Sequence, residues 1–176
     1  EFWWMMTNVM ELQAHAHSSD YEAQRSKFLD FSNRELFQED LAAVTIESKI
    51  YQLESRIIVY YRLDQISKMY TAARELVDLL DKHPQQFKWD AYRYFHALVF
   101  LLNANINDRK FGPGLLELKK GYKVFTLKGQ LPAIQVLRIG LHLVSQEIRH
   151  LVGLGLFTHA IRRIENLAPS ASQVFQ

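Results

Sequence analysis

The chain has 176 residues, a net charge of +2 at neutral pH and no cysteine, and 48% of its residues are hydrophobic while 23% are charged. The length suits one domain, or one compact piece of a longer protein, and a chain of this size buries roughly 70% of its unfolded surface. The apolar content excludes an intrinsically disordered chain. The absence of cysteine excludes a disulfide framework and a Cys-ligated metal site.

The charge is unevenly distributed along the chain. Residues 1–88 carry 14 acidic and 10 basic side chains, whereas residues 89–176 carry 5 acidic and 11 basic ones. The halves therefore differ in sign, which suits two surfaces with different partners. No uninterrupted run of about 20 apolar residues predicts a membrane span, and no signal-peptide pattern is present. We therefore expect a cytoplasmic protein.

Capping patterns and apolar periodicity predict helices in the first half of the chain. Ser19 and Ser32 each precede a glutamate by three residues, which is the spacing of a capping box. A long helix is predicted directly after the second box, and residues 66–83 form another that Pro84 ends. The apolar positions of the long helix are Leu36, Leu41, Val44, Ile50, Leu53 and Ile57.

The second half continues the helical pattern, without the alternation or turn dipeptides of strands. A helix is predicted over 89–105, ending in the turn-rich run 103–108. Pro113 suits the first turn of the next helix, which Gly129 closes. Pro132 opens a further helix through about residue 150. A tight turn at 153–155 then leads to a last helix that Pro169 ends.

These elements predict an all-α protein of about eight helices joined by short connections. Short connections make consecutive helices pack antiparallel. We therefore expect N-terminal helices within 1–33 and helical hairpins over 34–84, 88–129 and 132–169. The helix stops recur at separations of about 45 and 40 residues, a period typical of solenoids. Residues 1–176 are predicted to form a single helical-repeat domain or part of a longer array.

One predicted helix resembles the second helix of a tetratricopeptide repeat. It has a large residue at Met69, a small one at Ala72, apolar residues at Leu76 and Leu79, and a proline at Pro84. Residues 154–169 are similar, although Phe157 takes the small position, and 89–128 follow the outline with Gly114 there. The first-helix signature is largely replaced by Arg56, Val59, Tyr60 and Leu63. The resemblance implies a right-handed solenoid of antiparallel hairpins with a concave binding face.

A stack of hairpins exposes a long groove that suits an extended peptide or a partner helix. We therefore predict a protein- or peptide-binding scaffold that is not an enzyme and uses neither a cofactor nor a metal ion. Catalytic motifs and histidine spacings typical of metal sites are missing from the sequence. The candidate groove residues are Tyr60, Tyr61, Arg62, Arg93, Tyr94 and Arg138.

A basic cluster supports an alternative function. Clustered lysines attract anions through a long-range, salt-sensitive field, so helix 113–128 is a candidate for docking phosphate in a nucleic-acid-associated or regulatory protein. The other interpretation is an ordinary solvated helix face, with Tyr122 and Phe125 packed inward. The cluster consists of Arg109, Lys110, Lys119, Lys120, Lys123 and Lys128.

Overall fold

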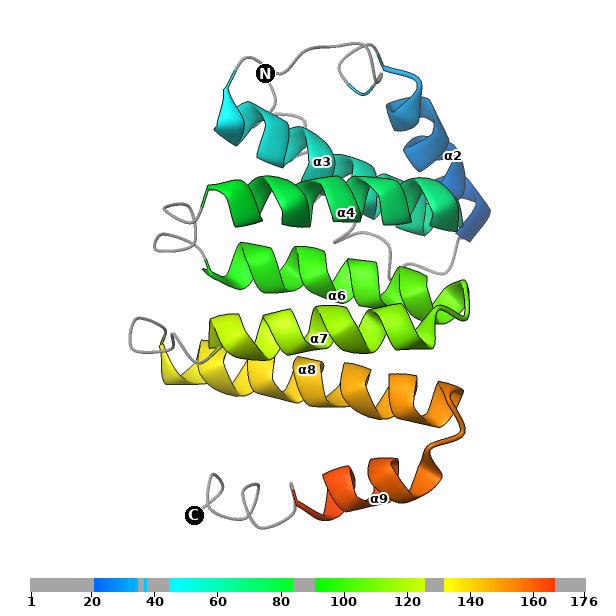
Figure 1. The fold of residues 1–176 in the computed structure, drawn as a ribbon. Coiled ribbons are helices and arrows are strands. Elements are labelled where there is room, and N and C mark those ends of the chain that lie inside the picture. Colours follow the sequence, from blue (N-terminus) through cyan, green and yellow to red (C-terminus); the bar gives the residue numbers. More distant parts are fainter. Residues whose placement is uncertain (1–20, 35–36, 38–44, 84–90, 126–131, 167–176) are drawn as a thin grey trace. The chain divides into compact units, whose positions relative to one another are not determined.

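The computed structural model describes residues 21–34, 37, 45–83, 91–125 and 132–166. Within these ranges the chain forms seven α-helices and no strand, so the predicted all-α class is confirmed there (Figure 1). The chain divides into two compact units, Glu1–Pro84 and Gln85–Gln176. We call them the N-terminal and the C-terminal unit and describe each by itself.

The N-terminal unit contains α2 (Tyr21–Ser32), α3 (Ile46–Arg62) and α4 (Ile66–Lys82). Thr45 caps α3: its hydroxyl accepts a hydrogen bond from the backbone N–H of Ser48 at 3.1 Å, and the Ser48 hydroxyl accepts one from Thr45 N–H at 3.0 Å. This reciprocal pair satisfies two orphan donors of the first turn. The prediction for residues 66–83 is confirmed, because α4 ends at Lys82 directly before the cap residue His83.

The prediction that a helix begins at Ser32 was wrong. Ser32 is the last residue of α2, and its hydroxyl donates to the carbonyl of Leu29 at 2.7 Å instead of capping a new helix. Such a bond to the preceding turn is a common alternative for serine. The long helix begins at Ile46, and the predicted apolar positions Leu36, Leu41 and Val44, like Ser19, lie outside the described residues.

Helix α3 is the most enclosed element of the N-terminal unit. Every residue from Gln52 to Tyr60 is buried, although an isolated helical stripe would leave half of them in water. Arg56 lies in this run and donates from Nε and Nη2 to the carbonyl of Phe37, at 3.2 and 3.1 Å. The ring of Phe37 meets those of Phe31 and Tyr60 edge to face, with centroids 5.9 and 5.5 Å apart. These contacts fix residue 37 between α2 and α3.

The C-terminal unit contains α6 (Ala91–Asn107), α7 (Phe111–Phe125), α8 (Ala133–Gly153) and α9 (Phe157–Glu165). As predicted, Pro113 lies in the first turn of α7 and Pro132 precedes α8. A turn with Gly155 at φ 73° joins α8 to α9, and glycine adopts this left-handed conformation without strain. The predicted closing residue Gly129 lies outside the described residues.

The helix predicted over 89–105 ends inside the turn-rich run 103–108, as predicted, and reaches Asn107. Helix α6 continues through the polar run to Asn107 because the side chain of Asn103 is used between helices. Its Oδ1 accepts hydrogen bonds from Gln146 Nε2 at 2.9 Å and from Arg149 Nη1 at 2.6 Å, both on α8. Residues that favour turns when exposed thus serve here to join α6 to α8.

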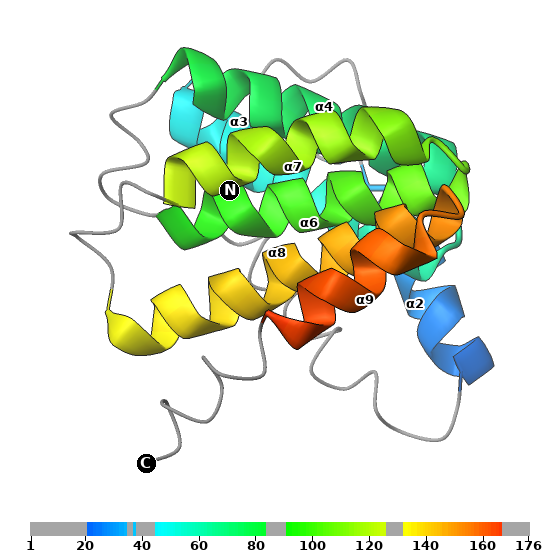
Figure 2. The same cartoon turned by 60° about the horizontal axis from the view of Figure 1, so that its bottom comes forward.

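Close helix contacts define the core of the C-terminal unit. Helix α8 packs against α6, α7 and α9, and α6 packs against α7 (Figures 1 and 2). A Cβ at Gly114 of α7 would collide with the ring of His150, and one at Gly121 would collide with Leu98 and press on Leu143. The absence of side chains at these two positions therefore lets α7 approach both neighbours. None of the described helices is long and apolar enough to cross a membrane.

Candidate binding surfaces

Three of the predicted groove residues lie at the end of α3, in the N-terminal unit. Tyr60 is only 7% exposed, because its ring packs against Phe37, whereas Tyr61 is 45% exposed and Arg62 is half-buried. The three are consecutive in the helix and therefore point in different directions. Of these three, Tyr61 presents the most surface to a partner, and Tyr60 belongs to the core.

The other three predicted groove residues lie in the C-terminal unit. Tyr94 is 1% exposed and meets Phe95 edge to face, with centroids 5.9 Å apart. Arg93 is half-buried on α6, and Arg138 is exposed on α8. Tyr60 and Tyr94 were chosen because tyrosine binds partners well, but the aromatic ring also stabilises a core. The two buried rings offer no surface, whereas Arg138 remains available.

The predicted basic cluster is partly neutralised by neighbouring carboxylates. Lys110 pairs with Asp108 at 2.9 Å, and Lys120 pairs with the buried Glu117 at 3.3 Å. Arg109 and Lys119 are exposed. Pairing cancels much of the long-range field on which phosphate docking depends. The side chain of Lys123 and the whole of Lys128 lie outside the described residues.

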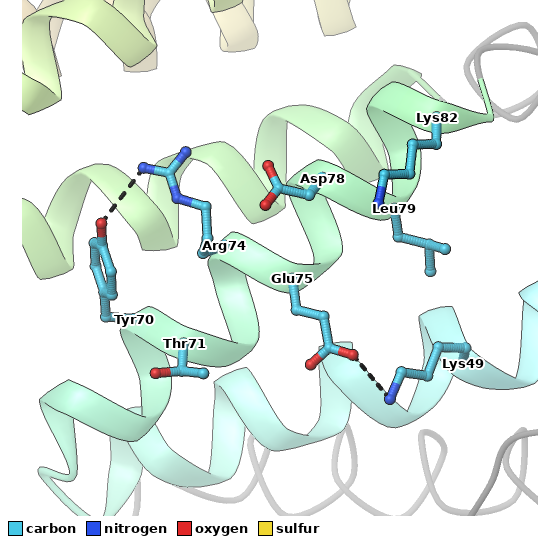
Figure 3. Close-up of a pocket in the computed structure, with 8 residues that line it drawn as sticks. All are labelled: Lys49, Tyr70, Thr71, Arg74, Glu75, Asp78, Leu79 and Lys82. Carbon is cyan, nitrogen blue, oxygen red and sulfur yellow. Dashed lines mark hydrogen bonds and ion pairs between the residues drawn. The ribbon is translucent and has the colours of Figure 1, made fainter.

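A groove of about 540 Å³ runs along α4 of the N-terminal unit (Figure 3). Its walls carry both signs of charge, and Glu75 pairs with Lys49 at 2.9 Å while the Arg74 guanidinium lies over the ring of Tyr70. Small-molecule sites are lined mostly by hydrophobic and aromatic side chains with a few convergent polar groups, whereas five of the eight residues that line this groove are charged. Its lining consists of Lys49, Tyr70, Thr71, Arg74, Glu75, Asp78, Leu79 and Lys82.

Exposed large apolar side chains gather on α8, on α9 and in the turn between them. Of the eleven exposed large apolar side chains among the described residues, eight lie between 134 and 164. Phe157, Ile161 and Ile164 of α9 are 60, 55 and 52% exposed, and Ala160 is the one buried residue of this helix. Concentration of exposed apolar residues in this way marks interaction surfaces more often than scattered residues do.

The apolar residues of α8 and α9 lie on the same side of the helix pair. Successive helical positions turn by about 100°. The residues of each helix therefore form parallel strips that follow one another around its axis. On α9, Arg163 reaches Tyr122 of α7, buried Ala160 comes next, and the exposed apolar strip lies beyond Ala160. On α8, Glu147 reaches the same tyrosine, buried Val144 comes next, and the exposed strip again lies beyond it. Both strips therefore face away from α7.

We call this surface the α8–α9 face. The resemblance of residues 154–169 to a repeat puts Phe157 at the small position, where helices approach closely, yet Phe157 is 60% exposed. The signal that marks these positions, the strip repeating every third or fourth residue, was present in the sequence, but their exposure was not. The face consists of Leu141, Val152, Phe157, Ile161 and Ile164.

A polar cluster holds α9 against α7 and α8. Tyr122 donates to Glu147 Oε2 at 2.6 Å, and Arg163 donates from Nε to the same oxygen at 2.8 Å and from Nη2 to the Tyr122 hydroxyl at 3.0 Å. Burial, and then the hydrogen bond to Glu147, raise the pKa of Tyr122 to about 12. The hydroxyl is therefore neutral at ordinary pH and links the three helices.

A second buried polar group lies at the contact of α7 and α8. The His150 ring is completely buried, and its Nδ1 lies 2.7 Å from the carbonyl of Gln146. Burial lowers the pKa of His150 below its ordinary 6.5, although the hydrogen bond to Gln146 opposes this shift. A neutral ring with the proton on Nδ1 donates to that carbonyl. The ring packs directly against Gly114 of α7.

No metal-binding cluster occurs in the part of the chain that the structure describes, since no three histidine or carboxylate side chains there are grouped to hold an ion. The surfaces that remain are therefore the α4 groove, the partly neutralised basic cluster and the α8–α9 face. Comparisons of the chain with protein-family models, with curated proteins and with solved structures give no match.

Proposed function

We propose that this chain is a protein- or peptide-binding scaffold without catalytic activity, and that the α8–α9 face accepts a helix of a partner protein. The observation that carries the proposal is the gathering of exposed apolar side chains on this face. Burying such side chains contributes about 25 cal/mol for each Å² removed from water. Two adjacent helices also form a shallow groove between them, which suits an amphipathic helix.

The proposal includes a tetratricopeptide-like solenoid. Consecutive helices pack as the pairs α3–α4, α6–α7 and α8–α9, and α8 contacts both helices of the preceding pair. This contact pattern supports stacking, because each hairpin of a solenoid buries its apolar side against a neighbour. In such a stack each hairpin packs against the next one along the chain. The exposed side of α8–α9 corresponds to the side on which a following helix would pack.

Nucleic-acid binding receives less support. Of the four basic-cluster residues with described side chains, Lys110 and Lys120 each have a carboxylate within 3.3 Å. Binding to a phosphate backbone depends on unpaired cations whose counterions are released on contact. The apolar side chains of the α8–α9 face, by contrast, are 45–60% exposed.

The function is tested with a displayed library of random helical peptides selected on the whole chain. We expect selected peptides to bind with micromolar affinity, and the double variant Phe157→Ser/Ile161→Ser to bind them at least about tenfold more weakly, since loss of buried anchors typically costs more than 1 kcal/mol. Leu29→Ser removes a comparably exposed side chain from α2 and serves as the matched control. It leaves binding unchanged.

The result that contradicts the function is equally direct. If the selected peptides bind the double variant as tightly as they bind the original chain, the binding surface lies elsewhere. A selection that yields no specific peptide also removes the proposal. Circular dichroism of both variants checks that the helical content is retained.

A further inference from the structure

The charges that border the α8–α9 face are distributed asymmetrically. Arg138, His142 and Arg149 are exposed along α8, on the edge of the apolar strip that faces away from α9. They follow at intervals of four and seven residues, so they form one line. The opposite edge, on α9, carries the exposed Glu165 and, three residues before it, the exposed Arg162. The face thus has a basic edge on α8 and an edge of mixed charge on α9.

The basic edge has no carboxylate of its own on α8. Glu147 is the one acidic residue of this helix, and it is engaged by Tyr122 and Arg163 on the side toward α7. Arg149 uses Nη1 for its bond to Asn103, which leaves its other donors for additional contacts. Arginine presents five N–H donors in a planar fork that matches a carboxylate.

We propose that the partner of the α8–α9 face is an amphipathic helix with acidic residues along the edge that lies over Arg138 and Arg149. This inference rests on the proposed function and specifies the chemistry of its partner. The two arginines are eleven residues apart on α8, or about 16 Å at 1.5 Å per residue. A partner helix running beside α8 has the same rise. Its acidic residues therefore recur at the same interval, with the apolar stripe between them and Glu165.

The asymmetry argues against an anionic membrane as the occupant. A helix lying on such a surface normally carries basic residues along both margins of its apolar side. Here the α9 margin carries Glu165 beside Arg162, so this margin is mixed in charge and not uniformly basic. A helix with two different edges satisfies both margins at once, and the charges also fix the direction in which it lies.

The test uses three synthetic helices with the same apolar stripe and length. One carries glutamates on the edge that meets α8, the second carries the same glutamates on the other edge, and the third carries glutamines. Binding to the whole chain is measured by fluorescence anisotropy at low and at moderate salt. We expect the first helix to bind about tenfold more tightly than the other two, because each exposed charge pair contributes a few-fold. This preference shrinks as salt is added.

Charge reversal on the protein completes the test. Arg138→Glu, and separately Arg149→Glu, are expected to abolish the preference for the first helix while binding of the glutamine helix is retained. The two variants are tested separately because Arg149 also bonds Asn103. Arg25→Glu reverses an exposed charge on α2 and serves as the control with unchanged preference.

The outcomes separate failure of the inference from failure of the function. Equal binding of all three helices overturns the acidic-edge inference and leaves the helix-binding function intact. Binding of none of them overturns both. Co-sedimentation with phosphatidylserine vesicles that Ile161→Ser abolishes, or a dimer in analytical ultracentrifugation that the same substitution dissociates, assigns the face to lipid or to a second copy and overturns the inference.

Discussion

Helices α3 and α9 carry similar kinds of residues but meet opposite environments. In α3 ten residues are buried, among them Glu54 and Arg56, although this helix mixes polar and apolar residues around its circumference. In α9 the separation of polar and apolar residues is cleaner, yet only Ala160 is buried. The better amphipathic helix is therefore the less covered one.

This difference shows that an amphipathic pattern predicts which side of a helix is apolar. It does not predict which neighbouring element, if any, buries that side. The burial of α3 needs polar contacts as well as apolar ones, and Arg56 provides two of them by binding the carbonyl of Phe37. Helix α9 is attached through a few contacts at one margin, including the bonds of Arg163. Its apolar strip stays exposed, and the following predictions test this difference between the two helices.

The largest expected effect compares truncations in the two helices. Leu53 of α3 is completely buried, so Leu53→Ala should lower the free energy of unfolding by about 2–5 kcal/mol. Ile161→Ala, at a side chain exposed by 55%, should change it by less than about 0.5 kcal/mol. Urea unfolding followed by circular dichroism measures both. Equal losses would mean that the strip of α9 is already covered within the chain.

Arg56→Met tests the polar contribution to the burial of α3. The substitution keeps an apolar stem but removes the donors to Phe37, and hydrogen bonds to charged groups are worth about 1.5–3 kcal/mol. We expect a loss of that size in the free energy of unfolding, compared with almost none for the exposed control Arg25→Met. A stability equal to that of the original chain would show that the buried guanidinium is not needed.

Two glycines at the start of α7 allow a matched test of helix packing. Gly114→Ala forces the new methyl group against the ring of His150, and overpacking of this kind costs about 1–3 kcal/mol. At Gly112 nothing lies within 4 Å of an added Cβ, so Gly112→Ala should stabilise by about 0.5 kcal/mol through the lower entropy of the unfolded chain. Thermal unfolding measures the change in stability of both variants. Changes of the same sign would contradict the close packing of Gly114 against His150.

The pH dependence of the C-terminal unit should reflect His150. Its pKa is lowered in the folded chain, so the folded state favours the neutral ring. The stabilisation is complete above the ordinary value of 6.5 and is lost as the pH falls below it. After division by the intrinsic base-catalysed exchange rate, we expect the protection of the α8 amides to fall between pH 7.5 and pH 5 by more than that of the α3 amides. NMR titration of the ring that gives a pKa at or above 6.5 would rule out this explanation.

Tyr122→Phe has the smallest expected effect. It removes the hydroxyl that joins Glu147 to Arg163 and should cost about 1 kcal/mol. Hydrogen exchange should increase in α9 and remain unchanged in α3. Because the pKa of Tyr122 is raised, the stabilisation is complete below pH 10 and is lost as the pH rises through about 12. The ultraviolet titration of the variant should lack this late step.

Much of the fold was predictable from local chemistry. Pro84, Pro113 and Pro132 mark helix boundaries because proline lacks a backbone N–H and fixes φ, and the helices observed near them agree. Gly155 likewise marks a turn through its positive φ. The sequence was less informative where a side chain can hydrogen-bond in two ways. The Ser32 hydroxyl bonds the preceding turn and does not cap a new helix, and Asn103 bonds α8 and does not end α6.

The candidate site was less predictable than the helices. Tyr60 and Tyr94 were chosen for a groove, yet both rings are buried, because tyrosine suits a core as well as an interface. Arg138, predicted as a groove residue, is exposed, but the prediction did not include the apolar strip beside it. Its exposure depends on which neighbour covers α9, and no local pattern contains that information.

The sequence by itself determined that this chain is helical and where most of its described helices begin and end. These features follow from backbone chemistry at single residues and from apolar periodicity, both of which act over a few positions. Only the tertiary structure decided which apolar strips are covered, because burial depends on contacts between residues far apart in the chain. The exposed strip of α9 and the basic edge of α8 are therefore products of packing.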